Sequence, residues 1–206
     1  MALFTEDQLT RQLSRQFVSG VSGTWNDNLS TKASTILSKS ISEQKLFSAT
    51  PGKTFDIFLS HSSEDAKLVA GLKLELEDLG FSVYVDWIED AHLDRKNVTK
   101  KTALLLQQRI KQCMTLIYAF SENASNSKWM PWELGYFDGI MGKVAVLPIS
   151  KTSKSSFVGS EYLGIYYYVQ IDKISGTNTT TLWIHETSNK YIMFNAWTTG
   201  SEPIQR

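Results

Sequence analysis

Short apolar runs alternate with helical stripes through the middle of this 206-residue chain. Five of the runs have the length of buried strands, and they cover residues 55–60, 81–86, 114–119, 144–149 and 165–171. The stripes between them carry apolar residues every three or four positions, and they predict helices over residues 62–79, 98–112 and 129–141. Strands that alternate with helices predict an α/β fold, here a five-stranded parallel sheet with helices on both faces.

The first 50 residues predict two further helices. Thr5 and Gln8 have the spacing of a capping box, and a stripe that reaches Phe17 follows them. A second stripe runs over residues 27–41, after a glycine-containing break at 20–23. We expect a helical hairpin that either packs on the main domain or serves as an oligomer contact.

The end of the chain predicts a β-hairpin. Two apolar runs, over residues 182–186 and 191–197, flank a Thr-Ser-Asn turn. The expected organisation is therefore a helical extension over residues 1–50, a main domain over 53–172, and a β-hairpin extension over 173–206 that packs on the main domain.

Charge and cysteine content limit the classes of binding partner and the cellular compartment that we expect. Lysine and arginine total 21, as do aspartate and glutamate, so the positive field that binders of phosphate backbones use is missing. We expect neither nucleic acid nor membrane as a partner, since no apolar stretch approaches the ~18 residues of a membrane span and no signal-peptide pattern opens the chain. Cys113 is the sole cysteine, which fits a reducing cytoplasm, and its apolar context predicts a core residue.

Polar and aromatic residues gather where the predicted strands end. Open parallel sheets bind ligands beyond the carboxyl ends of their strands, at the point where strand order reverses. The candidate binding residues delivered there by the first two strands are His61, Ser62, Asp86 and Trp87. Three of them also have a structural alternative: a capping role for the histidine, a turn for the aspartate and partial burial for the tryptophan.

Trp129 and Glu133 are the strongest candidates. They lie four residues apart, on one face of a predicted helix, so an aromatic wall and a carboxylate can line one pocket. Pro131 is tolerated in a first turn, which places Glu133 near the positive end of the helix dipole. The alternative is a helix whose tryptophans belong to the core and whose glutamate only interacts with that dipole.

An aromatic ring beside an anion suits the cationic nicotinamide of NAD⁺. Loss of nicotinamide leaves an oxocarbenium-like ribosyl group, which one carboxylate can stabilise, and nicotinamide leaves neutral, so no acid is needed. The sequence lacks the G-x-G-x-x-G fingerprint of dehydrogenases and any cluster with metal-ligand spacing. We therefore expect NAD⁺ as a substrate, with no separate cofactor and no metal. The helix start after Ser62 suits the pyrophosphate, and Asp86 suits ribose hydroxyls.

Three segments in this order resemble the Toll/interleukin-1 receptor (TIR) domain family. They are Asp56 to Asp65, Gly80 to Asp86 and Ser127 to Leu134, and the resemblance covers about residues 53 to 172. The stretch that begins Trp-Met-Pro-Trp-Glu is most similar to bacterial stand-alone TIR proteins, which include the TIR components of the Thoeris antiphage system.

The resemblance implies a flavodoxin-like fold and NAD⁺ hydrolase or cyclase activity. It implies that Glu133 is the catalytic carboxylate, that Trp129 stacks against nicotinamide and that His61 faces the substrate. Asp86 and Trp87 stand where the mobile second-strand loop of the family begins. The comparison also implies homo-oligomers formed through TIR contacts, and a product, a cyclic ADP-ribose isomer or related conjugate, that activates a separate effector protein.

One departure affects the phosphate site. Many TIR domains that cleave NAD⁺ carry an aromatic residue and an arginine after the first strand, where this chain has residues 61–63, His-Ser-Ser. Phosphate contacts must then come from backbone groups or from elsewhere, such as Arg95. Two other functions stay open: a non-catalytic TIR module that works by assembly, and an enzyme similar to nucleoside deoxyribosyltransferases.

Overall fold

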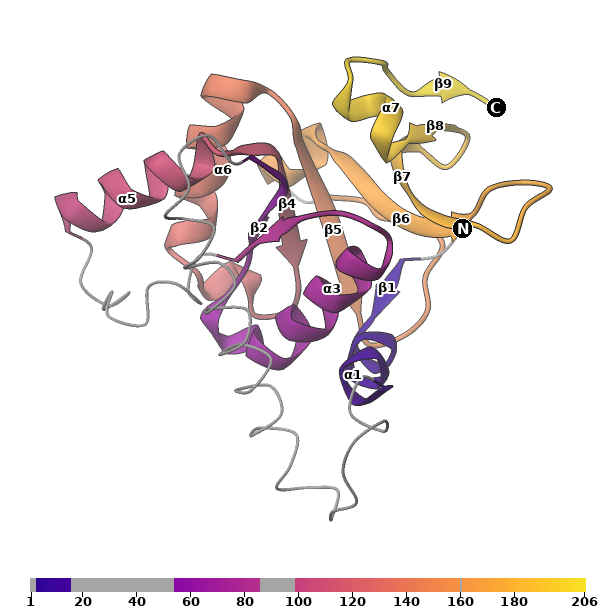
Figure 1. The fold of residues 1–206 in the computed structure, drawn as a ribbon, viewed down its shortest axis with the longest axis horizontal. Coiled ribbons are helices and arrows are strands. Elements are labelled where there is room, and N and C mark those ends of the chain that lie inside the picture. Colours follow the sequence, from indigo (N-terminus) through magenta and orange to yellow (C-terminus); the bar gives the residue numbers. More distant parts are fainter. Residues whose placement is uncertain (1–2, 16–53, 86–98, 160) are drawn as a thin grey trace, which may run out of the picture.

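A five-stranded parallel sheet forms the centre of the computed structural model, which describes residues 3–15, 54–85, 99–159 and 161–206. Its strands are β2 (Phe55–Ser60), β3 (Val83–Tyr84), β4 (Cys113–Phe120), β5 (Val144–Ser150) and β6 (Tyr167–Lys173). They lie in the order β3-β2-β4-β5-β6 (Figure 1). This is the expected flavodoxin-like order, with the first and third of these strands adjacent at its switch point.

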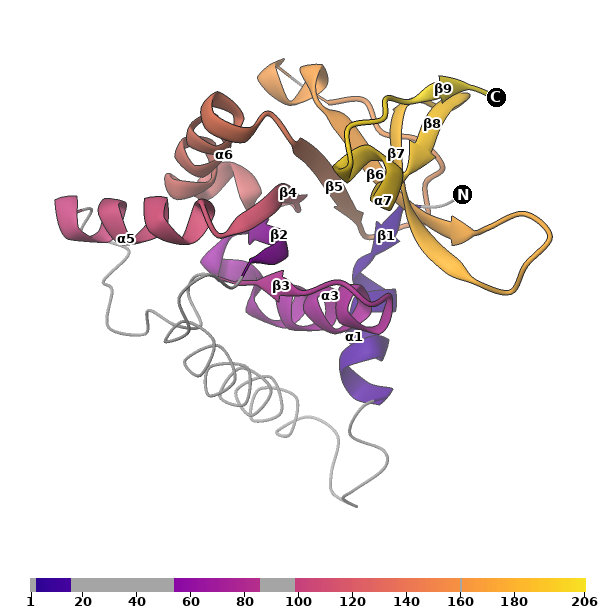
Figure 2. The same ribbon diagram turned by 45° about the horizontal axis from the view of Figure 1, so that its top comes forward.

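Alternation of side chains along each strand builds two apolar layers. Ile57 and Leu59 of β2 face a core that also receives the helices α1 (Glu6–Arg15) and α3 (Ala66–Asp78). Phe58 faces the opposite layer, which is formed with α5 (Lys100–Ile110) and α6 (Trp129–Met141). The two helix pairs therefore lie on opposite faces of the sheet (Figure 2), as a buried parallel sheet requires.

Helix α6 begins and ends as its sequence predicts. The backbone N–H of Met130 donates to the hydroxyl of Ser127 over 3.3 Å. Pro131 lies in the first turn, where its missing N–H removes no helical hydrogen bond. Gly142 ends the helix with a positive φ of 65°, and its N–H donates to the carbonyl of Asp138. Glu133 thus lies just beyond the first turn.

The N-terminal segment is built into the main core. Residues of β1 (Phe4–Thr5) pair in parallel with the end of β5, at Ile149 and Ser150, a strand that the sequence pattern did not indicate. Helix α1 confirms the first predicted helix, and its Leu9 and Leu13 are fully buried. The second predicted helix, over residues 27–41, and Phe17 lie outside the described residues.

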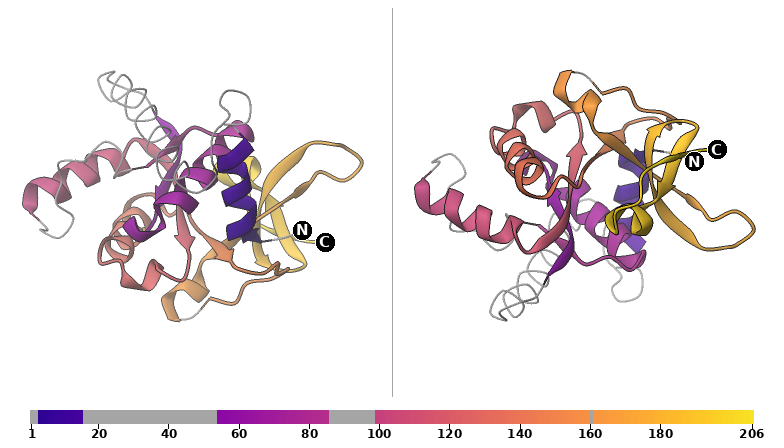
Figure 3. Two further views of the ribbon diagram at one scale, coloured as in Figure 1. Left: turned by 90° about the horizontal axis from the view of Figure 1, so that it is seen from below. Right: turned by 90° about the horizontal axis from the view of Figure 1, so that it is seen from above.

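The C-terminal segment extends the sheet with antiparallel strands. They are β7 (Thr180–Thr187), β8 (Lys190–Met193) and β9 (Ile204–Gln205), and they lie on the same side of the molecule as β1 (Figure 3). The predicted strand over residues 191–197 is wrong in its second half, which forms helix α7 (Phe194–Thr198). The reason is packing, because Phe194 and Trp197, three residues apart, both insert into the core. In the described ranges, no helix is long and apolar enough to cross a bilayer.

Candidate functional site

Glu133 lies at the carboxyl end of the sheet. Its side chain is 2% exposed, and its Oε2 accepts a 2.6 Å hydrogen bond from the hydroxyl of Ser60, the last residue of β2. This distance lies at the short end of the range for hydrogen bonds between a hydroxyl and an oxygen acceptor. Ser60 of β2 therefore holds the carboxylate at the switch point of the sheet, where the sequence pattern predicts a ligand.

Trp129 lies in the same buried part of helix α6. Its side chain is 7% exposed, and its ring meets that of Trp132 edge to face, with centroids 5.5 Å apart. The ring of Trp132 in turn stacks on Tyr136 over 5.6 Å. The edge-to-face contact with the half-buried Trp132 thereby holds the ring of Trp129 in its orientation.

Tyr118 is a neighbour of Glu133 that sequence reasoning missed. It pairs with Ser60 across β2 and β4, so both side chains point to the face that α6 covers. Burial raises the pKa of the Tyr118 phenol, and the neighbouring Tyr162 and the Glu133 charge raise it further. The phenol is therefore a protonated donor near the carboxylate, and no sequence signal distinguishes it from a core tyrosine.

His61 follows β2 and is buried, with 2% of its side chain exposed. Its Nδ1 lies 2.8 Å from the carbonyl oxygen of Leu59. A carbonyl only accepts, so Nδ1 carries the proton of this hydrogen bond. The ring is thus held by the chain beside the last residue of β2.

Ser62 and its neighbours shape the loop after β2. The hydroxyl of Ser62 accepts from the N–H of Glu64 over 3.3 Å and caps the 3₁₀ turn η1 (Ser63–Asp65). The buried Asp65 accepts hydrogen bonds from Ser121 and, over 2.7 Å, from the amide of Asn123. These bonds tie the loop after β2 to the loop after β4, so the two sides of the switch point are held together.

The surface beside the start of helix α3 carries a net negative charge. A hollow of about 440 Å³ beside it is lined by four carboxylates and two lysines. The carboxylates belong to Glu6, Glu64, Asp65 and Glu122. Their excess negative charge opposes the pyrophosphate that the sequence pattern places at this helix start.

Some of the predicted site residues lie outside the described residues, and other residues that the sequence analysis considered have structural roles. Asp86, Trp87 and Arg95 fall in the stretch 86–98, outside the described residues. Cys113 is buried as expected, and burial raises the pKa of its thiol. His185 stacks between two tyrosine rings. In the part of the chain that the structure describes, no group of three or more metal-ligating side chains is present.

The chain is similar to two proteins of known name. It is 50% identical over 160 residues to the protein named "Probable 3' cyclic ADP-D-ribose synthase ThsB'" of Bacillus cereus strain MSX-D12, which covers 77% of this chain and 83% of that protein. It is 32% identical over 85 residues to "Putative cyclic ADP-D-ribose synthase TIR2" of Cytobacillus dafuensis, which covers 41% of this chain and 22% of that protein.

A family model supports the same conclusion. The model described as "TIR domain" matches residues 57–176, from the second residue after the start of β2 to the turn after β6. The match spans the five parallel strands apart from the first two residues of β2, together with helices α3, α5 and α6, and it includes Ser60 and Glu133. The chain therefore belongs to the TIR domain family.

Proposed function

We propose that this protein cleaves the nicotinamide–ribose bond of NAD⁺ and closes the ADP-ribose product into a cyclic isomer. The observation that carries the proposal is the buried carboxylate of Glu133, held by Ser60 at the carboxyl end of the sheet. A domain that acts only by assembly has no use for a carboxylate fixed in this way. The names of the two similar proteins, both cyclic ADP-D-ribose synthases, support the same reaction.

The chemistry follows from one fixed negative charge. Nicotinamide would stack on Trp129 while its ribose lies against Glu133. As the bond from ribose C1 to the pyridinium nitrogen breaks, the electron pair goes to nicotinamide and positive charge spreads over the ribose. A carboxylate that is already in place stabilises that charge without reorganisation. The hydroxyl of Ser60 keeps the carboxylate in position.

The remaining site residues complete the proposal. His61 would contact the substrate from the end of β2, and Ser62 would shape the loop beside it. Asp86 and Trp87 would contribute from the segment that follows β3, with the aspartate on ribose hydroxyls. Cyclisation then requires a nucleophile of the ADP-ribose itself, such as a ribose hydroxyl, to reach C1 before water does.

We further propose a signalling role. The cyclic product would leave the protein and activate a separate effector in antiphage defence, in the cytoplasm, as in Thoeris systems. Contacts between TIR domains would form a homo-oligomer and regulate the activity. The similarity to a protein named ThsB' over three quarters of the chain supports this role.

The test is a product analysis. Wild-type protein and the Glu133→Gln variant are incubated with NAD⁺ at low and high protein concentration, and products are separated by chromatography and weighed by mass spectrometry. The wild type should release nicotinamide together with a product lighter than ADP-ribose by one water. The variant, which keeps the shape of the side chain and an acceptor for Ser60, should release neither. Equal release by both proteins would remove Glu133 from the mechanism.

The second candidate is a non-catalytic assembly module. It predicts that both proteins leave NAD⁺ intact at every concentration and that Glu133→Gln leaves self-association unchanged. Sedimentation velocity on the same samples measures that association.

A further inference from the structure

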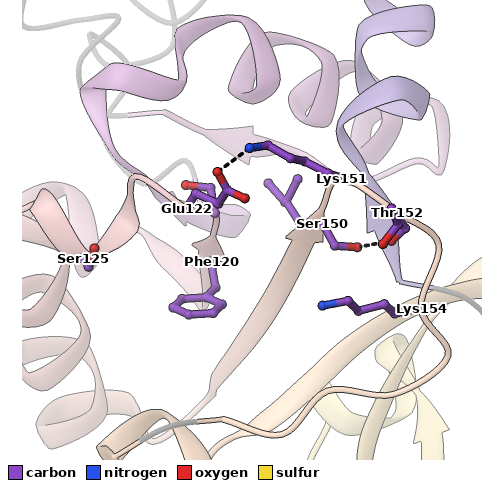
Figure 4. Close-up of a pocket in the computed structure, with 9 residues that line it drawn as sticks. Phe120, Glu122, Ser125, Ser150, Lys151, Thr152 and Lys154 are labelled. Carbon is purple, nitrogen blue, oxygen red and sulfur yellow. Dashed lines mark hydrogen bonds and ion pairs between the residues drawn. The ribbon is translucent and has the colours of Figure 1, made fainter.

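A second hollow lies at the carboxyl end of the sheet, between the loops that follow β4 and β5 (Figure 4). Its volume is about 410 Å³, within the range of small-molecule sites. The wall combines an aromatic ring, Phe120, with the ammonium groups of Lys151 and Lys154 and the carboxylate of Glu122. The hydroxyls of Ser121 and Ser150, also in the wall, donate to Asp65 and to the Thr152 carbonyl. An aromatic ring and a cation are groups that bind a base and phosphates.

The charge of this hollow is positive. Lys151 forms a 2.6 Å ion pair with Glu122 on one side of it, so these two charges balance. Lys154 extends toward the space between Phe120 and Ser150 (Figure 4). Among the described residues, no ion pair engages Lys154. Its charge is therefore available to an anion that enters from solvent.

The loop that carries Lys154 is fixed on both sides. The N–H of Leu3 donates to the carbonyl of Lys154 over 3.0 Å, next to the pairing of β1 with the end of β5. The buried amide of Gln170 donates to the carbonyl of Ser155 over 2.7 Å. The backbone beneath the lysine is thus held by hydrogen bonds to two other elements, and the N-terminal segment gains a role in building the wall.

The hollow begins close to the candidate catalytic residues. Phe120 lies two residues beyond Tyr118 along β4, a distance of about 7 Å. Its ring packs against the same apolar layer as Met130 and Leu134 of helix α6. A dinucleotide with one ribose at Glu133 can therefore extend along this face toward Lys154. The neighbouring hollow at the start of α3 is lined by more carboxylates than lysines, so it does not suit the phosphates of the dinucleotide.

We infer that the hollow beside Lys154 binds the ADP part of the dinucleotide, with the diphosphate at Lys154 and the adenine against Phe120. This deepens the proposed function and rests on it for the identity of the ligand. The binding of an ADP group itself does not depend on cleavage, so the two can be tested separately.

The experiment measures binding of ADP and of adenosine to the full-length protein by calorimetry. The Lys154→Gln variant should bind ADP about 10-fold more weakly, the loss expected for one charged hydrogen bond, with its affinity for adenosine unchanged. Phe120→Leu should weaken both ligands. The matched control is Lys111→Gln, an exposed lysine at the opposite, amino-terminal end of β4, which should change neither. Equal ADP affinity in wild type and Lys154→Gln would overturn the inference.

Steady-state kinetics show whether the hollow binds the ADP part of the substrate or that of the cyclic product. If the hollow holds the ADP part of NAD⁺, Lys154→Gln raises KM for NAD⁺ by the same factor and leaves kcat within about 2-fold. An unchanged KM with weaker inhibition by the cyclic product would assign the hollow to the product and overturn the substrate assignment. ADP binding through Lys154 without any nicotinamide release would refute the proposed function while the nucleotide site stands.

Discussion

At the scale of single residues, the candidate site is built on the hydrogen-bonded pair of Glu133 and Ser60. The spacing of Trp129 and Glu133 predicts that both lie on one helix face, and both side chains are buried in the structure. That this face carries the chemistry stays a prediction. The partner of Glu133 is not visible in the sequence, since Ser60 is 73 residues away along the chain. Ser60 ends an apolar run. It donates to Glu133 only because the fold places the end of β2 beside helix α6.

Replacing Ser60 by alanine tests that partnership. The Ser60→Ala variant loses the hydrogen bond that holds the carboxylate, so we expect kcat for nicotinamide release to fall about 10- to 100-fold, equivalent to roughly 1.5–3 kcal/mol. Steady-state assays with NAD⁺ measure this. Ser188→Ala, in the exposed turn after β7, is the control and should retain wild-type kcat. A Ser60→Ala enzyme as fast as the control would show that the bond does not matter.

His185 gives the fold a dependence on pH. Its ring lies between Tyr168 and Tyr191, with centroids 5.2 and 4.9 Å away. Burial lowers the pKa of His185, and the hydrogen bond to the Thr187 carbonyl offsets part of that effect. The unfolded chain therefore takes up a proton more readily, so the free energy of unfolding should decline as pH falls below about 6.5.

The His185→Phe variant keeps a ring between the two tyrosines but cannot take up a proton. Denaturant unfolding from about pH 7 to about pH 5 should give a shallower decline for this variant than for the wild type. Parallel curves for the two proteins would show that His185 does not titrate on unfolding.

At the scale of elements, alternation of strands and helices was predictable and their boundaries were less so. Strand β3 covers only Val83–Tyr84, shorter than its apolar run, because pairing with β2 rather than composition sets its length. Helix α7 replaced half of a predicted strand, since the core accepts Phe194 and Trp197 from one helix face. Strand β1 has two residues, too few to produce a pattern.

The contact between helices α1 and α3 provides a test at this scale. A Cβ at Gly71 would lie 2.2 Å from the carbonyl oxygen of Leu9, so Gly71→Ala must push the helices apart. We expect a loss of about 1–3 kcal/mol in the free energy of unfolding, measured by denaturant titration. Gly139→Ala in α6 is the matched control, because nothing lies within 4 Å of its added Cβ, and it should be neutral or stabilising by up to about 1 kcal/mol. Equal effects at the two glycines would contradict this packing.

At the scale of the whole molecule, one core includes both ends of the chain. Leu9 from α1, Ile57 from β2 and Trp197 from α7 belong to the same apolar cluster. The sequence pattern predicts a main domain with an extension at each end, the C-terminal one packed on that domain, because the ends follow different periodicities. Periodicity reports local structure, whereas the pairing of β1 with β5 depends on a contact between segments far apart in the sequence.

Trp197 tests whether the ends unfold with the sheet. Its side chain is 2% exposed, and the ammonium of Lys143 lies 5.2 Å from its ring centroid. Trp197→Ala should cost about 3–5 kcal/mol and should shift a single unfolding transition, followed in parallel by tryptophan fluorescence and circular dichroism. A separate early transition, with the remaining transition at its wild-type position, would instead show that the C-terminal strands form an independent unit.

The most direct test of the central claim is a single-turnover measurement. Wild type and Glu133→Gln, each in an excess over NAD⁺ that a binding titration shows to be saturating, are compared for the rate of nicotinamide release. We expect similar affinity for NAD⁺ and a rate about 100- to 1,000-fold lower in the variant, the order of effect seen when a group that stabilises transition-state charge is removed. Release at comparable rates from the two bound complexes would contradict it.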